Sequence, residues 1–187
     1  SSSRLSAMLA EDREQIHCVE HIEDGDIGEW RRARGLNRRP TCIVLSKNLE
    51  LPIDALLAKP HCDLVIMAGS GADPADAARL TRGGVEVRIA PQRWVVGADI
   101  AAIARERGFR TLYAIGGPDI LYTMLDARLL DRLYVTVAHV ALAGRDFDTL
   151  SRGDTLTPPF GFRLNELYLD PPQGRKPELL FASYNRA

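Results

Sequence analysis

Cysteine is scarce in this sequence, and no stretch of it stays apolar for long. Its three cysteines are odd in number and unclustered, which is typical of reduced thiols and predicts a cytoplasmic protein. No apolar run approaches the roughly 20 residues that span a bilayer. The first residues turn acidic where a secretory signal would be apolar, so we expect neither a membrane anchor nor a signal peptide.

The sequence also lacks an excess of either charge. Its 24 basic and 25 acidic residues leave a net charge of −1. A dedicated nucleic-acid-binding protein would be strongly basic, so neither a nucleic-acid nor a membrane partner is expected. A length of 187 residues fits one domain with a core that needs no disulfide or metal.

Short apolar, β-rich runs alternate with helical segments along most of the chain. The runs predict strands at Thr41–Leu45, Leu64–Met67, Val85–Ile89, Leu112–Ile115 and Leu133–Leu142. Helices are expected from Pro74 to Arg82 with Asp73 as N-cap, from Asp99 to Arg107, and from Gly117 onward, where an apolar stripe extends to Leu129. This alternation predicts a mostly parallel central sheet with helices on both faces.

The two ends of the chain differ from this alternating body. FRLNELYLD and ELLFASYN near the C-terminus alternate apolar and polar residues across a turn-rich connection, which predicts an antiparallel hairpin. The first 21 residues fit a short amphipathic helix, and the charged stretch Glu23–Pro40 fits a solvated loop. The predicted class is therefore α/β, with a parallel body and an antiparallel C-terminal hairpin.

A zinc-protease pattern, H-x-x-E-H, occurs at His17–His21. Two imidazoles one helical turn apart can hold zinc, but a catalytic zinc needs a third protein ligand and a substantial scaffold. We therefore expect no bound metal and interpret these histidines as surface residues, with a zinc hydrolase as a minor alternative.

The most informative segment is Gly116-Gly117-Pro118-Asp119, which follows one predicted strand and begins a helix. Glycines there allow a ligand close to the backbone, and a helix N-terminus carries a partial positive charge that suits a pyrophosphate. A tight turn that holds no ligand explains the same residues about equally well.

Two other predicted strands also end in small or basic residues. Ser46 and Lys47 follow the first strand, and Gly69 and Ser70 follow the second. The carboxyl ends of parallel strands meet at one edge, where open α/β sheets bind ligands. NAD sites tend to carry an acid at this edge, whereas NADP sites carry small or basic residues, so Ser46 and Lys47 predict NADPH.

The segment AIGGPDILYTMLDARLLDRLYVTVAHVALAGRDFDTL resembles the C-terminal signature of the riboflavin-biosynthesis pyrimidine reductases, which have a dihydrofolate-reductase-like fold. RRPTCIVLSKNLELP resembles a second stretch of that family, and the resemblance extends from about Arg38 to Ala187. It implies one reductase-like domain over residues 1–187 that forms a homodimer. The implied reaction is hydride transfer from NADPH to C1′ of a ribosylamino-pyrimidine or related substrate.

The resemblance also implies where the cofactor lies. The pyrophosphate would bind at the turn before the helix, and the adenosine end would lie near Ser46. Together with the strand ends, the expected cofactor residues are Ser46, Lys47, Gly69, Ser70, Gly116, Gly117, Pro118, Asp119, Ile120 and Leu121.

The sequence departs from the family pattern in two ways. The S-L-D-G and G-A-G-T strands of the family are not found, so we expect its N-terminal strands to be missing here. The riboflavin enzymes commonly place a glutamate before the glycine pair, where this chain has Ile115. These departures keep open a second interpretation, a catalytically inactive nucleotide-binding or dimerisation module of the same fold. No catalytic residue can be assigned from the sequence.

Overall fold

The computed structural model describes residues 26–37, 40–57, 63–141, 149–172, 174 and 177–187. The chain divides into two compact units, residues 1–95 and 96–187, and each is described by itself. The helix expected in the first 21 residues lies outside the described part of the chain. None of the described helices is long and apolar enough to cross a membrane.

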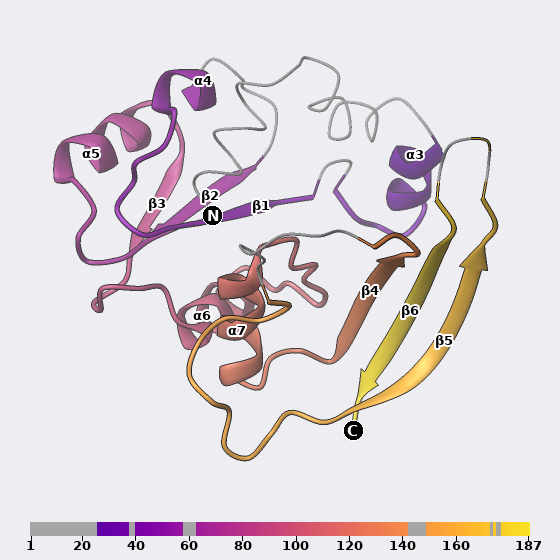
Figure 1. Cartoon of the computed structure of the whole chain (residues 1–187). Coiled ribbons are helices and arrows are strands. Elements are labelled where there is room, and N and C mark those ends of the chain that lie inside the picture. Colours follow the sequence, from indigo (N-terminus) through magenta and orange to yellow (C-terminus); the bar gives the residue numbers. More distant parts are fainter. Residues whose placement is uncertain (1–25, 38–39, 58–62, 142–148, 173, 175–176) are drawn as a thin grey trace. The chain divides into compact units, whose positions relative to one another are not determined.

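The first unit contains a parallel three-stranded sheet with the strand order β1-β2-β3 (Figure 1). Its elements are α3 (Asp26–Arg32), β1 (Cys42–Ser46), α4 (Ile53–Leu57), β2 (Leu64–Ala68), α5 (Pro74–Arg82) and β3 (Glu86–Ile89). The predicted strands at Thr41–Leu45, Leu64–Met67 and Val85–Ile89 are therefore confirmed within one or two residues.

The core of the first unit lies between the central strand and the two helices α4 and α5. Ile66 and Ala68 on β2 pack with Leu49, Ile53 and Leu80, all of them buried. Ile66 and Ala68 lie two residues apart and so share one face of the strand. This packing fixes the carboxyl end of the sheet, where the predicted ligand residues lie.

Helix α5 begins and ends where its sequence signals predict. The Asp73 side chain accepts a hydrogen bond of 2.7 Å from the Ala75 N–H, and Pro74 occupies the first helical position. The Gly83 N–H closes the helix by donating to the Arg79 carbonyl at 3.1 Å. The N-cap side chain pairs with a backbone N–H that has no partner within the helix, and proline has no N–H to pair. Local residues were therefore sufficient to predict where this helix begins.

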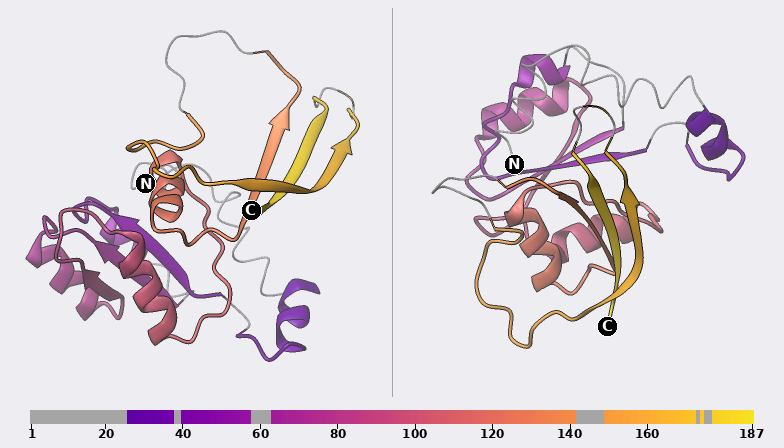
Figure 2. Two further views of the ribbon diagram at one scale, coloured as in Figure 1. Left: turned by 90° about the horizontal axis from the view of Figure 1, so that it is seen from below. Right: turned by 45° about the vertical axis from the view of Figure 1, so that its right-hand side comes forward.

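The second unit combines two helices with an antiparallel sheet of strand order β4-β6-β5 (Figure 2). Its elements are α6 (Gly97–Glu106), α7 (Pro118–Asp126), β4 (Arg132–Ala138), β5 (Phe162–Asp170) and β6 (Leu179–Arg186). The predicted C-terminal hairpin is confirmed as the β5–β6 pair, and β4 pairs antiparallel with β6. The α/β class is confirmed.

The predicted strand at Leu112–Ile115 is wrong. Residues 111–117 form no helix or strand, and the side chains of Tyr113 and Ile115 are 79% and 94% exposed. An apolar run forms a strand only where a neighbouring strand can pair with it, and none of the described strands does so here.

Two further predictions need correction. The predicted strand Leu133–Leu142 ends earlier, at Ala138, because the pairing stops where the partner strand begins, at Leu179. The charged segment Glu23–Pro40, expected to be a loop, contains helix α3.

Local interactions between charged and aromatic side chains support α3. Arg32 lies 3.8 Å from Glu29, one turn away, and the Arg34 guanidinium lies 4.0 Å from the centre of the Trp30 ring. Arg31 and Arg32 also lie in the last turn, where cations interact favourably with the helix dipole. The many charged residues of this segment therefore do not prevent it from forming a helix.

Candidate functional site

The glycine pair precedes a helix as predicted, although the strand expected before it is not formed. Gly117 is the N-cap of α7, with extended backbone, and Pro118 takes the first helical position. The N–H groups of Ile120 and Leu121 both donate to the Gly117 carbonyl, at 3.1 and 3.2 Å. The turn therefore presents the positive end of the α7 dipole beside a residue without a side chain.

The two glycines of this turn have different surroundings. A Cβ at Gly116 would lie 2.7 Å from the Ile120 Cβ, so this glycine is needed for packing against the helix. A Cβ at Gly117 would meet nothing within 4 Å. Only Gly117 therefore has the open approach that a bound phosphate requires.

Asp119, in the first turn of α7, forms an ion pair with Arg152. The Arg152 Nε lies 3.3 Å from the Asp119 carboxylate, and the Arg152 N–H donates to the Pro118 carbonyl at 3.1 Å. The guanidinium balances the acidic charge at the helix N-terminus, so the carboxylate does not by itself prevent an anion from approaching.

The second predicted group of residues lies at the carboxyl edge of the β1–β3 sheet. Lys47 and Ser70 are exposed, and the Gly69 N–H donates to the Lys47 carbonyl at 3.2 Å. A Cβ on Gly69 would overlap the Arg93 carbonyl oxygen, so Gly69 is needed for close packing of two loops. The structure thus brings these predicted residues together, in the first unit.

Ser46 has a structural contact that the sequence did not indicate. Its side chain is only 6% exposed, and its hydroxyl accepts a hydrogen bond of 3.1 Å from the Leu49 N–H. Leu49 has a positive φ of 62°, which a leucine adopts only when its surroundings hold it there. Ser46 therefore stabilises the turn after β1.

Two residues at this edge were missed by the sequence analysis. Arg93 and Trp94 follow β3, and the indole of Trp94 lies beneath two cationic side chains, those of Lys47 and Arg93. The sequence could have indicated them, because both residues follow a third parallel strand at the same edge as Ser46 and Gly69. The remaining predicted residues, Gly116 to Leu121, lie in the second unit.

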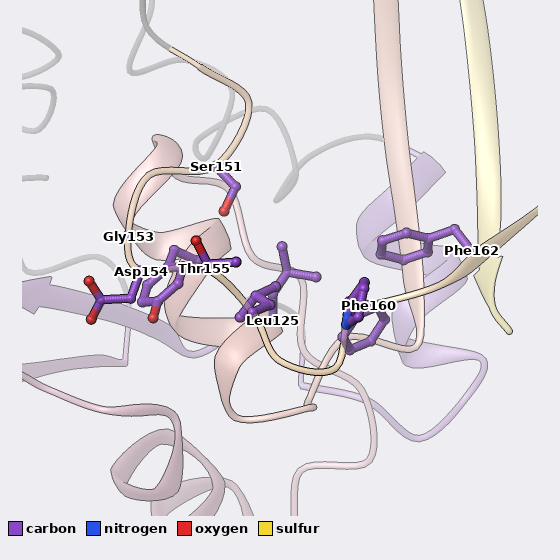
Figure 3. A pocket seen from close by; sticks show the side chains of 10 residues that line it. Leu125, Ser151, Gly153, Asp154, Thr155, Phe160 and Phe162 are labelled. Carbon is purple, nitrogen blue, oxygen red and sulfur yellow. The ribbon is translucent and has the colours of Figure 1, made fainter.

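A pocket of about 370 Å³ lies in the second unit, between α7 and the segment that leads into β5 (Figure 3). Apolar side chains dominate its wall, together with the polar residues Ser151, Asp154 and Thr155. None of the predicted cofactor residues lines it, so it is separate from the glycine turn.

The metal prediction remains a prediction. His17 and His21 lie outside the described residues, and the described part of the chain contains no group of three His, Cys, Asp or Glu residues that would hold a metal ion. Metal analysis of the purified protein tests it: about one zinc per chain, lost in His21→Ala, would contradict it.

Comparisons with known proteins give a consistent result. The pattern of the RibD C-terminal domain family matches residues 3–166. No curated protein matches the sequence. A solved structure of a pyrimidine reductase-like protein from Corynebacterium diphtheriae is 18% identical and has a TM-score of 0.73; the match covers 100% of this chain and 86% of that one.

Two longer proteins also share the fold. Acinetobacter baumannii RibD is 15% identical with a TM-score of 0.56, and the match covers 78% of this chain and 37% of that one. A Thermotoga maritima diaminohydroxyphosphoribosylaminopyrimidine deaminase/5-amino-6-(5-phosphoribosylamino)uracil reductase is 13% identical with a TM-score of 0.52, covering 80% and 38%. At these identities the structures show a common fold, and this chain spans well under half the length of both.

Proposed function

The chain belongs to the RibD C-terminal domain family, and from that premise we propose that it is an NADPH-dependent reductase. The proposed reaction is hydride transfer to C1′ of a ribosylamino-pyrimidine or a related substrate. One of the structural neighbours carries the name 5-amino-6-(5-phosphoribosylamino)uracil reductase, and another is called pyrimidine reductase-like. The membership confirms the family resemblance that the sequence suggested.

The observation that carries the proposal is the open approach at Gly117. A dinucleotide pyrophosphate needs a backbone without a side chain next to a helix N-terminus, and this turn has both. Gly116 packs against Ile120 and so holds the turn in place, while Arg152 balances the Asp119 charge. The residues present therefore fit the phosphate portion of the cofactor.

In this proposal the protein supplies binding and orientation. NADPH, when bound, supplies the hydride. The turn at Gly117 and Pro118 would hold the pyrophosphate, and Lys47 would meet the 2′-phosphate at the adenosine end. We assign no side chain as proton donor to the substrate.

A second candidate is an inactive nucleotide-binding or dimerisation module of the same fold. The observation that favours it is Ile115, which stands where the riboflavin enzymes commonly have a glutamate that meets the substrate. Its side chain is 94% exposed and apolar, so it can offer a substrate neither charge nor a hydrogen bond.

One pair of measurements separates the two candidates. NADPH binding is followed by fluorescence titration, and turnover by NADPH oxidation with 5-amino-6-(5-phosphoribosylamino)uracil or the same compound without its phosphate. Binding together with turnover supports the reductase. Binding without turnover on either compound supports a nucleotide-binding module. The absence of binding contradicts the reductase and leaves only the dimerisation module.

We further propose that the protein is a cytoplasmic homodimer. The antiparallel sheet supports the dimer, because the rows of its strand pairing place apolar side chains on one face. That face contains Leu133, Val135, Val137, Leu164, Leu167, Leu169, Leu180, Ala182 and Tyr184. Leu164, Leu167 and Leu169 are each about half exposed, and large exposed apolar patches usually mark interaction surfaces.

A further inference from the structure

Trp94 is an exposed indole that two cations contact. Its side chain is 52% exposed. The Lys47 Nζ lies 4.5 Å from the ring centre, and the Arg93 guanidinium carbon lies 5.3 Å from it. Both distances are within the range at which a cation is attracted to an aromatic face. Two like charges therefore share one aromatic ring.

In the part of the chain that the structure describes, no acid neutralises these two cations. Among the described residues, no carboxylate lies within ion-pair distance of Lys47 or Arg93. Contact with one indole relieves only part of their mutual repulsion, because a cation–π contact at an exposed site is weak. The three side chains together form a positively charged surface with a flat aromatic centre, which we call the Trp94 platform.

The backbone holds the Trp94 platform at the carboxyl edge of the parallel sheet. The Ser70 N–H donates to the Gln92 carbonyl at 2.9 Å, and the Gly69 N–H donates to the Lys47 carbonyl at 3.2 Å. Gly69 leaves no room for a side chain beside Arg93. The loops after β1, β2 and β3 are therefore tied together, so the platform is placed by the sheet rather than by a mobile loop.

We propose that the Trp94 platform binds adenosine that carries a phosphate on the 2′-oxygen of its ribose, with the adenine ring on the indole and the 2′-phosphate between Lys47 and Arg93. This inference rests on the proposed function and extends it, since it assigns Trp94 and Arg93 as specificity-determining residues for the 2′-phosphate. A charge-assisted hydrogen bond to a phosphate is stronger than a cation–π contact, so the cations move from the indole to the phosphate and free a ring face for stacking.

The chain contains a matched control for this arrangement. Trp30 on α3 is 51% exposed and lies beneath Arg34 at 4.0 Å, so it has nearly the same exposure and the same kind of contact. Among the described residues, one cation lies over it rather than two, and it does not follow a strand of the sheet. Trp30 and Trp94 are the two tryptophans of the chain, so fluorescence can separate them.

The test uses adenosine 2′,5′-bisphosphate and 5′-AMP as probes, with single-tryptophan variants of the whole chain. In Trp30→Phe, only Trp94 emits, and the bisphosphate should quench its emission with saturation. In Trp94→Phe, only Trp30 emits, and no saturable quenching should appear. Quenching of Trp30 alone would overturn the proposal, and so would an absence of quenching from Trp94 while NADPH binds.

Side-chain truncation then separates stacking from charge recognition. Trp94→Leu should weaken the binding of both probes about tenfold, because stacking does not depend on the 2′-phosphate. Arg93→Met should weaken the bisphosphate about tenfold and leave 5′-AMP unchanged. Equal loss for both probes in Arg93→Met, or no loss in either variant, would contradict the assignment. Circular dichroism shows whether each variant folds. If Trp94→Leu does not fold, Arg93→Met and the quenching experiment still test the proposal.

The failure of this inference is distinguishable from the failure of the proposed function. If NADPH binds equally well to the wild type, Trp94→Leu and Arg93→Met, the inference is wrong and the reductase proposal stands. If the bisphosphate binds through Trp94 but no substrate is reduced, the inference is supported and the inactive module is favoured. If neither NADPH nor the bisphosphate binds to the wild type, both proposals fail.

Discussion

Gly116 and Gly117 are adjacent in the turn before α7, yet a substitution at each tests a different property. A side chain at Gly116 collides with Ile120, whereas one at Gly117 projects into open space. Loss of nucleotide binding in a Gly116 variant could therefore come from altered packing. Gly117 is the position at which ligand binding can be changed with the fold retained.

The first prediction is that Gly117→Val weakens NADPH binding at least tenfold without unfolding the protein. The isopropyl group occupies the space next to the helix N-terminus that a pyrophosphate needs. This steric conflict should cost more than about 1.4 kcal/mol of binding free energy, which corresponds to a tenfold loss of affinity. Fluorescence titration measures affinity, and the melting temperature without ligand is the control. A folded variant with unchanged affinity would place the phosphate elsewhere.

The second prediction concerns cofactor choice, which Lys47 should influence. None of the three residues directly after β1 is acidic, and the exposed Lys47 can meet a 2′-phosphate. A charge-assisted hydrogen bond is worth about 1.5–3 kcal/mol, so NADPH should bind roughly tenfold or more tightly than NADH. Titration of both cofactors decides this. Equal dissociation constants, or tighter binding of NADH, would contradict it.

At the scale of single elements, the sequence predicted best those whose signals are local. Asp73, Pro74 and Gly83 mark the two ends of α5, and each makes the contact that its residue type predicts. The run Leu112–Ile115 has equally strong β propensity but no paired strand among the described residues, and pairing partners cannot be read from a segment alone. The position of α3 was missed because its support comes from side-chain pairs within a charged segment.

The candidate site shows the same division. Lys47 could be proposed because it follows a predicted strand, and Gly117 because it precedes a predicted helix. The sequence could not show that Ser46 is buried against the Leu49 N–H, because that contact depends on how the turn folds. Nor could it show that Trp94 meets Lys47, since the two residues are 47 positions apart and are brought together only by the parallel pairing of β1, β2 and β3.

The third prediction tests the contact between α6 and α7. Gly97, the first residue of α6, is buried, and a Cβ there would overlap the Cβ of Ala127 and lie 3.0 Å from the Thr123 carbonyl oxygen. Gly97→Ala should therefore destabilise the fold by about 1–3 kcal/mol, the usual cost of overpacking. Thermal or urea unfolding measures the change.

Gly71→Ala is the matched control for Gly97→Ala. Gly71 follows β2, and a Cβ there would meet nothing within 4 Å. Its stability should change by less than about 0.5 kcal/mol, as for other surface substitutions. Equal losses in the two variants would mean that the effect comes from the glycine backbone rather than from contact between the helices.

At the scale of the whole molecule, the two faces of the β4-β6-β5 sheet differ in chemistry. One face carries aliphatic side chains together with Tyr184. On the other face, the pairing places Arg132 and Asn185 in one row and Glu166, Ser183 and Tyr134 in another. Arg132 donates a hydrogen bond to the Tyr134 hydroxyl, which raises its pKa, and its charge makes this end of the face polar. This second face also carries the aromatic side chains of Phe181 and Tyr168, in the same row as Thr136. The first face has more apolar side chains, so it gains more from being covered by a second copy.

The last prediction is a homodimer formed through that apolar face. Light scattering at micromolar concentration should give twice the 20.7 kDa mass of one chain. Leu167→Asp places a charge in the middle of the face, where Leu167 is 58% exposed, and should shift the protein to monomers.

Tyr168→Asp adds the same charge at the next residue, on the opposite face at 62% exposure, and should leave the dimer intact. Dissociation by Tyr168→Asp alone would move the interface to the polar face. A wild-type mass that stays at 20.7 kDa as concentration rises would refute the dimer itself. Two-fold contacts are the commonest assembly of soluble chains, and they bury one patch against its own copy. One charge at Leu167 would therefore enter the interface twice, which is why we expect a single substitution to be sufficient.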